Sequence, residues 1–185
     1  MNLFIDRPAL AQIRSEEISV YTDLVKALSK ENPQNPVLVI LAKTRPLSQS
    51  LLTSKADEIS GLMPIATKSV ISDFLNVGEK ELHFDIQKLT STLGNRVIAL
   101  SEKDYIKLFN GSMKLKEAWK NFYRQFPKSH SLIKFSRVGI DKEGRQALVL
   151  LSISSGGQFG AGDLFLLSKE NGRWKITQQV NIWIT

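Results

Sequence analysis

The sequence predicts an α+β fold in which an amphipathic helix packs on a C-terminal antiparallel sheet of four strands. Two observations support this prediction. Residues 115–126 place apolar side chains at the spacing of a helical stripe, and residues 132–184 contain four strand-like runs separated by turns. Strands joined by short connections form an antiparallel meander, whose apolar face needs a covering helix. Residues 1–112 are expected to be rich in helices and to add one to three strands.

The N-terminal half alternates between helical and strand-like patterns. Apolar side chains spaced three and four apart predict helices over residues 16–29 and 65–75. The continuous apolar runs 37–41 and 97–100 are typical of buried strands, and alternation over 82–86 predicts a half-exposed one. Because strands this apolar need a shared core, one integrated structure over residues 1–185 is expected.

Two further helices precede the sheet. Ser101 and Asp104 have the spacing of a capping box, which predicts a short helix up to Phe109. The second helix covers residues 115–126, and the proline at position 127 ends it. Its apolar stripe is expected to cover the sheet and consists of Leu115, Ala118, Trp119, Phe122, Tyr123 and Phe126.

The sheet is predicted from the runs 132–140, 146–154, 164–168 and 174–184. Gly144 and Gly172 lie in the two hairpin turns, where a residue with positive φ is needed. Strict alternation in the last run predicts one apolar face, formed by Trp174, Ile176, Val180, Ile182 and Ile184. Trp183 then points the other way, where it either stacks on a ligand or packs under the N-terminal half.

The two halves differ in charge. Residues 113–185 contain 12 lysines and arginines against 5 acidic residues, whereas residues 1–112 contain 13 of each. Basic side chains gathered at the hairpin ends would attract phosphates or an acidic surface. Because aromatic residues are not interleaved with them, nucleic acid is the weaker alternative. These basic residues are Lys128, Lys134, Lys142, Arg145, Lys169, Arg173 and Lys175.

Composition and motifs exclude several classes of function. The chain has no cysteine, so it forms no internal disulfide or thiolate centre. The longest apolar run, 37–42, is far shorter than the roughly 20 residues that span a bilayer. Glu81, His83 and Asp85 share one strand face at best, which is a weak metal signal. No cofactor, no metal and no catalytic constellation are therefore expected, which leans against an enzyme.

The glycine-rich stretch 154–162 is the first candidate site, through Gly156, Gly157 and Gly160. Glycines adopt positive φ and let successive amides converge on an anion. A dinucleotide motif would need a helix after the glycines, but residues 164–167 are strand-like. The alternative is a wide hairpin or bulge that bends the sheet.

Arg137, Tyr123 and Gln179 are the other candidates, as polar groups between helix and sheet. Arg137 shares its parity with Ile133 and Phe135, so it is expected to be partly buried. It either binds an anion or forms a structural ion pair with a carboxylate such as Asp163 or Asp141.

Four segments, 133–139, 146–149, 156–162 and 172–176, resemble a signature of an uncharacterised bacterial family. The resemblance covers about the last 70 residues. It implies an extracytoplasmic setting, because members tend to be exported or membrane-anchored. Two cysteines that are frequent in the family's glycine loop correspond here to Ser155 and Phe159. The closing strand pattern also resembles cystatin-like and nuclear-transport-factor-2-like folds, which pack a helix against a curved sheet.

The start of the chain leaves localisation open. Asp6 and Arg7 interrupt any apolar signal segment, which favours the cytoplasm, whereas Ala9-Leu10-Ala11 has the form of a signal-peptidase site.

Three functions follow from these patterns. The leading hypothesis is a non-enzymatic binding or protein-interaction domain, with a protein or a small anionic ligand as partner. The second is a nucleic-acid or anionic-surface binder that uses the C-terminal basic residues. The third is an enzyme or small-ligand carrier with a pocket between helix and sheet, and a fully packed interface there would exclude it.

Overall fold

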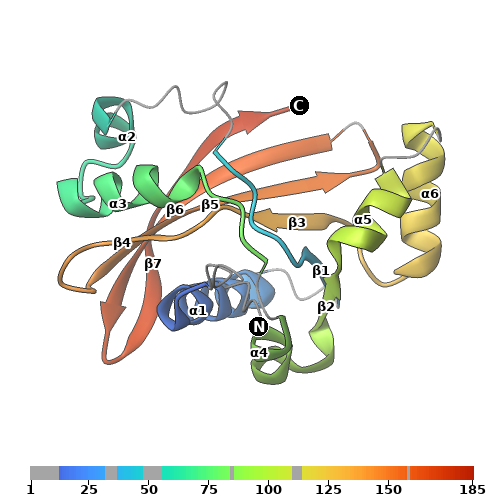
Figure 1. The fold of residues 1–185 in the computed structure, drawn as a ribbon, viewed down its shortest axis with the longest axis horizontal. Helices are drawn as coiled ribbons and strands as arrows, with labels where there is room; N and C mark the ends of the chain where they lie inside the picture. Colours follow the sequence, from blue (N-terminus) through green and yellow to red (C-terminus); the bar gives the residue numbers. More distant parts are fainter. Residues whose placement is uncertain (1–12, 32–36, 48–55, 84–85, 110–113, 158) are drawn as a thin grey trace, which may run out of the picture.

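A mixed seven-stranded sheet forms the centre of the protein in the computed structural model (Figure 1). The structure describes residues 13–31, 37–47, 56–83, 86–109, 114–157 and 159–185. The strand order is β2-β1-β3-β5-β6-β7, and β4 pairs with β5. The strands are β1 (Leu38–Leu41), β2 (Val97–Leu100), β3 (Leu132–Phe135), β4 (Gly139–Ile140), β5 (Gln146–Ser155), β6 (Phe159–Glu170) and β7 (Arg173–Ile184). The predicted α+β class is confirmed.

The two halves of the chain contribute different kinds of strand. β1 pairs in parallel with both β2 and β3, whereas β3, β5, β6 and β7 form the predicted antiparallel meander. Parallel neighbours need long crossover connections, and helices fill those connections here. The N-terminal half thus adds two strands to the sheet, within the predicted range of one to three.

Six α-helices are described, and they cover both faces and one end of the sheet. In Figure 1, α2 and α3 lie above the sheet, α1 and α4 lie below it, and α5 and α6 lie at its right-hand end. None of the described helices is long and apolar enough to cross a membrane. The helices are α1 (Ser15–Glu31), α2 (Ala56–Leu62), α3 (Lys68–Gly78), α4 (Ile86–Leu93), α5 (Glu102–Phe109) and α6 (Leu115–Gln125).

Three apolar clusters hold these layers together. The first packs α1 and α4 on one face of the sheet and includes Tyr21 and Trp174. The second packs α2 and α3 on the other face around Phe74. The third packs α6 on β1, β2 and β3, through Phe122 and Leu132. Each cluster joins residues of the N-terminal half to residues of the C-terminal half.

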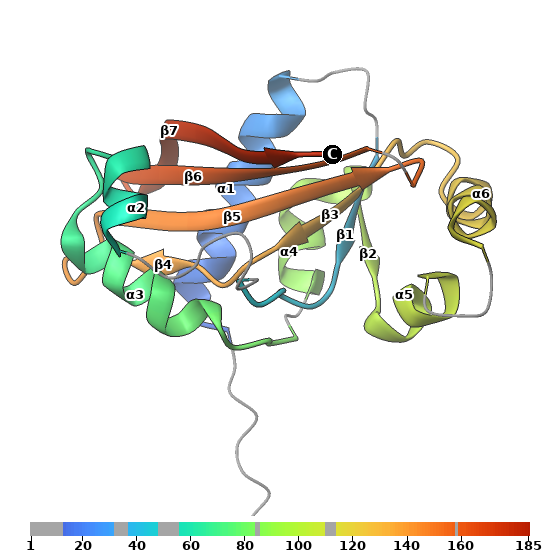
Figure 2. The same cartoon turned by 90° about the horizontal axis from the view of Figure 1, so that it is seen from above.

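The helix that covers Trp174 is α1. Trp174 donates its backbone N–H to Asp23 over 2.9 Å and its indole N–H to Ser19 over 3.0 Å. α6 does pack on the sheet, as predicted, but at the end formed by β1, β2 and β3. Figure 2 shows this separation, with α1 crossing the strands and α6 standing beyond their ends.

The single apolar face predicted for the last strand is wrong. Leu167 pairs with Ile176 and Leu166 pairs with Gln178, so Thr177 is an extra residue in β7. An extra residue of this kind reverses the alternation of side chains beyond it. Trp174 and Ile176 consequently belong to the α1 cluster, whereas Val180 and Ile182 pack with the cluster under α3.

Two other predictions also need correction. Ile86 begins α4, and Lys43 and His83 form only an isolated bridge, so the predicted strand over 82–86 is wrong. Phe84 and Asp85 lie outside the described residues. The glycine-rich stretch is mostly strand, because Ser154 pairs with Gly160 and Ser155 with Phe159. Only residues 156–158 are left for the turn, and Gln158 is not described.

Candidate functional site

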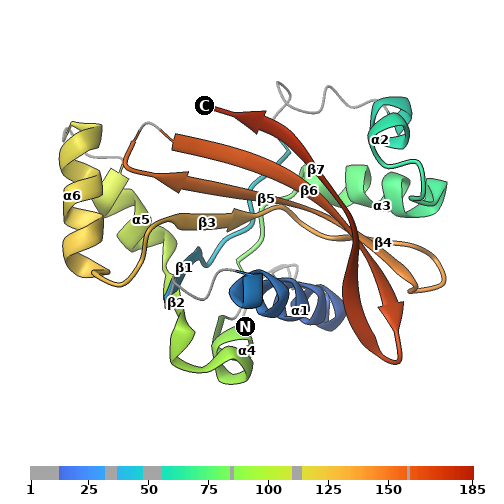
Figure 3. The same ribbon diagram turned by 180° about the vertical axis from the view of Figure 1, so that it is seen from behind.

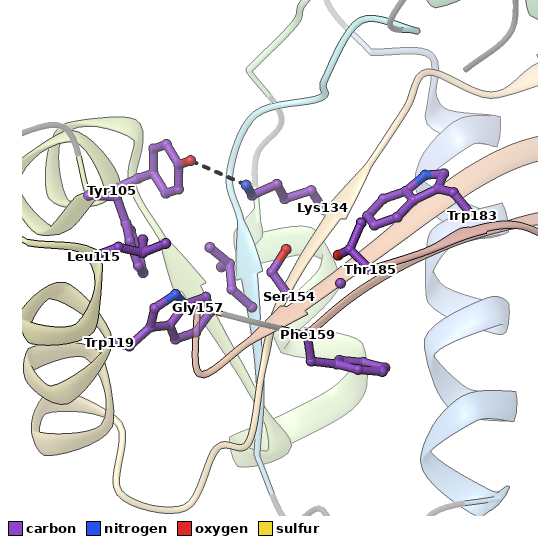
Figure 4. Close-up of a pocket in the computed structure, with 12 residues that line it drawn as sticks. Tyr105, Leu115, Trp119, Lys134, Ser154, Gly157, Phe159, Trp183 and Thr185 are labelled. Atoms are coloured by element: carbon purple, nitrogen blue, oxygen red, sulfur yellow. Dashed lines mark hydrogen bonds between the residues drawn. The ribbon is translucent and has the colours of Figure 1, made fainter. Parts of the chain in front are cut away.

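A cleft of about 460 Å³ separates α5 and α6 from the neighbouring ends of β3, β5, β6 and β7 (Figure 4). A cavity between helix and sheet, which the third hypothesis requires, is therefore present, but Arg137, Tyr123 and Gln179 do not line it. Most of its described lining is aromatic or aliphatic, and one side chain is charged. The lining residues are Tyr105, Phe109, Leu115, Trp119, Leu132, Lys134, Ser154, Gly157, Phe159, Gly160, Trp183 and Thr185.

Two glycines of β6 shape the sheet side of the cleft. The indole of Trp183 lies against Gly160 and Gly162, where an added Cβ would collide with the ring. At Gly162 the nearest atom would be Trp183 Nε1, and at Gly160 it would be Cζ3, at 2.9 Å. Besides its role in turns, glycine within a strand often marks a position where another group approaches the backbone closely. The glycines thus let Trp183 lie flat on the strand and form the floor of the cleft.

Aromatic side chains of α5 and α6 form the opposite wall. Phe109 meets Trp119 edge to face, with ring centroids 5.1 Å apart, and Tyr105 lies 5.2 Å from Phe109. Ser101 caps α5 by accepting the N–H of Asp104 over 3.1 Å, as the capping box predicts. The cap fixes where α5 starts, so Tyr105 and Phe109, four residues apart, face the same side.

Lys134 has the one charged side chain in the described lining. Its Nζ donates to the hydroxyl of Tyr105 over 3.2 Å and lies 4.8 Å from the centre of the Tyr105 ring. Figure 4 shows this hydrogen bond across the top of the cleft, with Ser154 below it. Lys134 and Ser154 belong to the paired strands β3 and β5, so the sheet fixes their separation.

Tyr123 fastens the glycine turn to α6. Its hydroxyl accepts the N–H of Gly156 over 2.9 Å and donates to the carbonyl of His130 over 3.2 Å. Gly156 and Tyr123 line a more open hollow beside the cleft, whereas Gly157 and Gly160 line the cleft itself. Gly157 has φ of 81°, and an added Cβ there would lie 3.0 Å from Trp119.

Arg137 lies away from the cleft, in a partly buried cluster that we call the Arg137 junction (Arg14, Glu17, Asp73, Arg137 and Val138). Arg137 donates to both oxygens of Glu17, over 2.8 and 2.6 Å. Val138 N–H and Arg14 Nε also donate to Glu17, over 3.2 and 3.0 Å. The structural ion pair anticipated for Arg137 is present, but its partner is Glu17 of α1, not Asp163 or Asp141.

The junction joins three elements of the fold. Arg14 extends it to α3 by donating to Asp73 over 3.2 Å, and Asp73 accepts the N–H of Ile140 over 2.8 Å. Burial of Glu17 acts to raise its pKa, but Arg137, Val138 N–H and Arg14 outweigh burial and hold the pKa below its ordinary value. Residues 137–140 therefore connect α1 and α3 to the sheet.

Gln179 is exposed on β7 and does not line the cleft. Of the six candidates, Gly157 and Gly160 reach the cleft, Tyr123 and Gly156 flank it, and Arg137 and Gln179 are elsewhere. Tyr105 and Phe109 were missed, although their spacing in a capped helix was a usable signal. Trp183 does point away from Trp174, as predicted, but parity is not the reason, because a second extra residue, Ile182, restores the alternation that Thr177 reverses.

The basic residues of the C-terminal half divide between the two ends of the sheet. Figure 3 shows the ends of the β4–β5 and β6–β7 hairpins on the side opposite α6. Two lysines there already have partners, because Lys169 contacts Glu16 and Lys175 contacts Glu170, each over 2.6 Å. Lys134 lies at the other end, in the cleft. The seven basic residues are therefore not all gathered at one end of the sheet.

The predicted polar strand face near His83 is an ion-pair cluster. Lys43 contacts Glu81 over 2.6 Å and Glu102 over 2.7 Å, and His83 lies 3.2 Å from Glu102. The hydrogen bonds from Lys43 to both carboxylates raise the pKa of Lys43. Within the described part of the chain, no group of three or more His, Cys, Asp or Glu could hold a metal ion.

Comparisons of this chain with protein-family models, with curated proteins and with solved structures gave no match.

Proposed function

We propose that this chain is a binding protein for a small, mostly apolar molecule that occupies the cleft between α5, α6 and the sheet. The observation behind this proposal is the exposure of apolar side chains at the cleft. Leu115 is 53% exposed and Phe159 is 50% exposed, and both line it. Exposed apolar surface gathered around one concavity is typical of a ligand site.

The volume and composition of the cleft agree with this reading. Small-molecule sites usually enclose about 300–1,000 Å³ and combine apolar walls with a few polar groups. The cleft, at about 460 Å³, provides two tryptophans, two further aromatic rings of α5, and the polar groups of Lys134, Ser154 and Thr185. A ligand that enters it would remove apolar surface of both partners from water, which favours binding.

A neutral fluorescent probe, N-phenyl-1-naphthylamine, tests this proposal. The probe brightens in apolar sites, and saturable binding is expected. Trp119 and Trp183 line the cleft, whereas the third tryptophan, Trp174, is buried under α1. In a Trp174→Phe variant the remaining tryptophan emission should therefore change as the probe binds.

Matched variants locate the binding. Ser154→Phe places a ring on the floor of the cleft and is expected to abolish saturable binding. Gln179→Phe adds the same ring to an exposed position of β7 outside the cleft and should leave binding unchanged. Circular dichroism checks that both variants fold. Absence of saturable binding to the unmodified chain, or equal binding by the Ser154→Phe variant, would refute the proposal.

A further inference from the structure

The charge inside the cleft identifies the class of ligand. Among the lysines and arginines whose side chains the structure describes, three are at least partly buried: Lys43, Lys134 and Arg137. Lys43 contacts two carboxylates and Arg137 contacts Glu17. Lys134 forms no ion pair within the described chain, and its one polar contact there is the neutral hydroxyl of Tyr105. Because a charge withdrawn from water is normally paired, Lys134 lacks the anion that its two counterparts have.

The charged side chains of the described lining indicate the charge of the ligand. They comprise one cation and no carboxylate. A phosphate monoester carries close to two negative charges at neutral pH and would meet a single lysine here. A monoanion matches the cleft better. We infer, on the basis of the binding function proposed above, that the ligand is an apolar monocarboxylate whose carboxylate binds Lys134.

Neighbouring groups complete a carboxylate site. Tyr105 provides a hydroxyl beside Lys134 Nζ, and Ser154 provides another from the adjacent strand. Both side chains face the cleft in Figure 4. A carboxylate that accepts from Lys134 and one hydroxyl gains charge-assisted hydrogen bonds, which are stronger than neutral ones. The rest of the ligand then extends toward Trp119 and Trp183, where flat apolar groups pack well against aromatic rings.

Competition against N-phenyl-1-naphthylamine tests the inference with pairs of equal shape. One pair is the acid anion 1-naphthaleneacetate with its amide, 1-naphthaleneacetamide. The other pair is octanoate with its amide, octanamide. Each acid is expected to displace the probe at about tenfold lower concentration than its amide, the effect of one charge-assisted hydrogen bond. Comparison of the two acids shows whether the apolar part is aromatic, as the tryptophans favour, or an acyl chain.

Lys134→Met assigns the effect to a residue. The variant keeps the apolar stem and loses the charge, so the acid and the amide of each pair should bind equally. Lys116→Met, at an exposed position of α6, should keep the preference for acids. The probe is neutral and should bind both variants, which confirms an intact cleft.

The outcomes separate this inference from the proposed function. If the probe binds but acids and amides compete equally in the unmodified chain, the binding function stands, and the inference that the ligand is an anion is refuted. A preference for acids that survives in Lys134→Met would also refute it, because another group would then select the charge. If the probe itself does not bind to the unmodified chain, the proposed binding function is refuted, and the inference that rests on it is refuted as well.

Discussion

Two cations three residues apart, Lys134 and Arg137, have opposite surroundings. Arg137 is sealed in the Arg137 junction, 6% exposed and bonded to both oxygens of Glu17. Lys134 faces an open cleft and has a tyrosine hydroxyl in place of a carboxylate. A buried charge with a complete set of partners serves the fold, whereas a cation without a counter-charge is available to a ligand. Loss of the ion pair at Arg137 should therefore lower stability, whereas loss of the charge at Lys134 should change ligand binding.

The largest effect is expected at the junction. Glu17→Gln removes the charge that balances Arg137 while keeping the shape of the side chain. Loss of one member of a buried ion pair costs about 3–5 kcal/mol, because the remaining charge stays out of water. Urea denaturation should show a loss of this order in the free energy of unfolding. A change below about 1 kcal/mol would mean that the junction contributes no more than an exposed ion pair.

On the cleft side, the largest stability effect is expected at Gly162. Alanine at this position must displace the indole of Trp183. Overpacking of this kind costs about 1–3 kcal/mol, and affinity for the naphthylamine probe should change as well. Gly61→Ala is the control, since nothing lies near its added Cβ in α2 and alanine favours a helix by up to about 1 kcal/mol. Stability equal to the unmodified chain in Gly162→Ala would show that Trp183 moves freely.

Lowering the pH should weaken the Arg137 junction. Because the pKa of Glu17 is lowered in the folded chain, its contribution is complete above the unfolded value and is lost as pH falls through the folded value. The urea midpoint should therefore decline as pH drops below the ordinary value of 4.5, and Glu17→Gln should lack this part of the decline. Parallel pH profiles for the two proteins would contradict the assignment.

The smallest stability change is expected for Lys134→Met. No ion pair within the described chain is lost, so the free energy of unfolding should stay within about 0.5 kcal/mol. The same variant should lose the preference for acids over amides. A loss of stability comparable to that of Glu17→Gln would place Lys134 with Arg137 as a structural charge and would end the contrast.

Local sequence patterns predicted the helices, strands and turns better than they predicted which of these contact one another. The capping box at Ser101, the two N-terminal strands and the glycine turns depend on nearby residues and are confirmed, although β2 is buried only at Val97 and Leu100. The extra residue Thr177 in β7 depends on the register with β6, which alternation within one strand does not show. Strand parity predicted that Arg137 is buried. It did not identify the carboxylate that pairs with Arg137, because that carboxylate belongs to Glu17 on α1.

The candidate site was predicted only in part for the same reason. Glycines 157 and 160 were recognised as unusual, but the sequence placed them in a loop, whereas Gly160 makes room for Trp183 within a strand. The cleft combines α5 and α6 with four strands, and no single periodicity contains that combination.

The position of β1 between β2 and β3 has a consequence for how the chain folds. The β5–β6–β7 hairpins pair neighbouring segments, whereas β1 must find β3 from the other half of the chain. Contacts between distant segments close slowly, because the loop entropy is lost before the pairing is gained. We expect the hairpins to form early and α5 and α6 to dock late. The binding cleft would then be completed last, so its affinity for ligand would report the final step of folding.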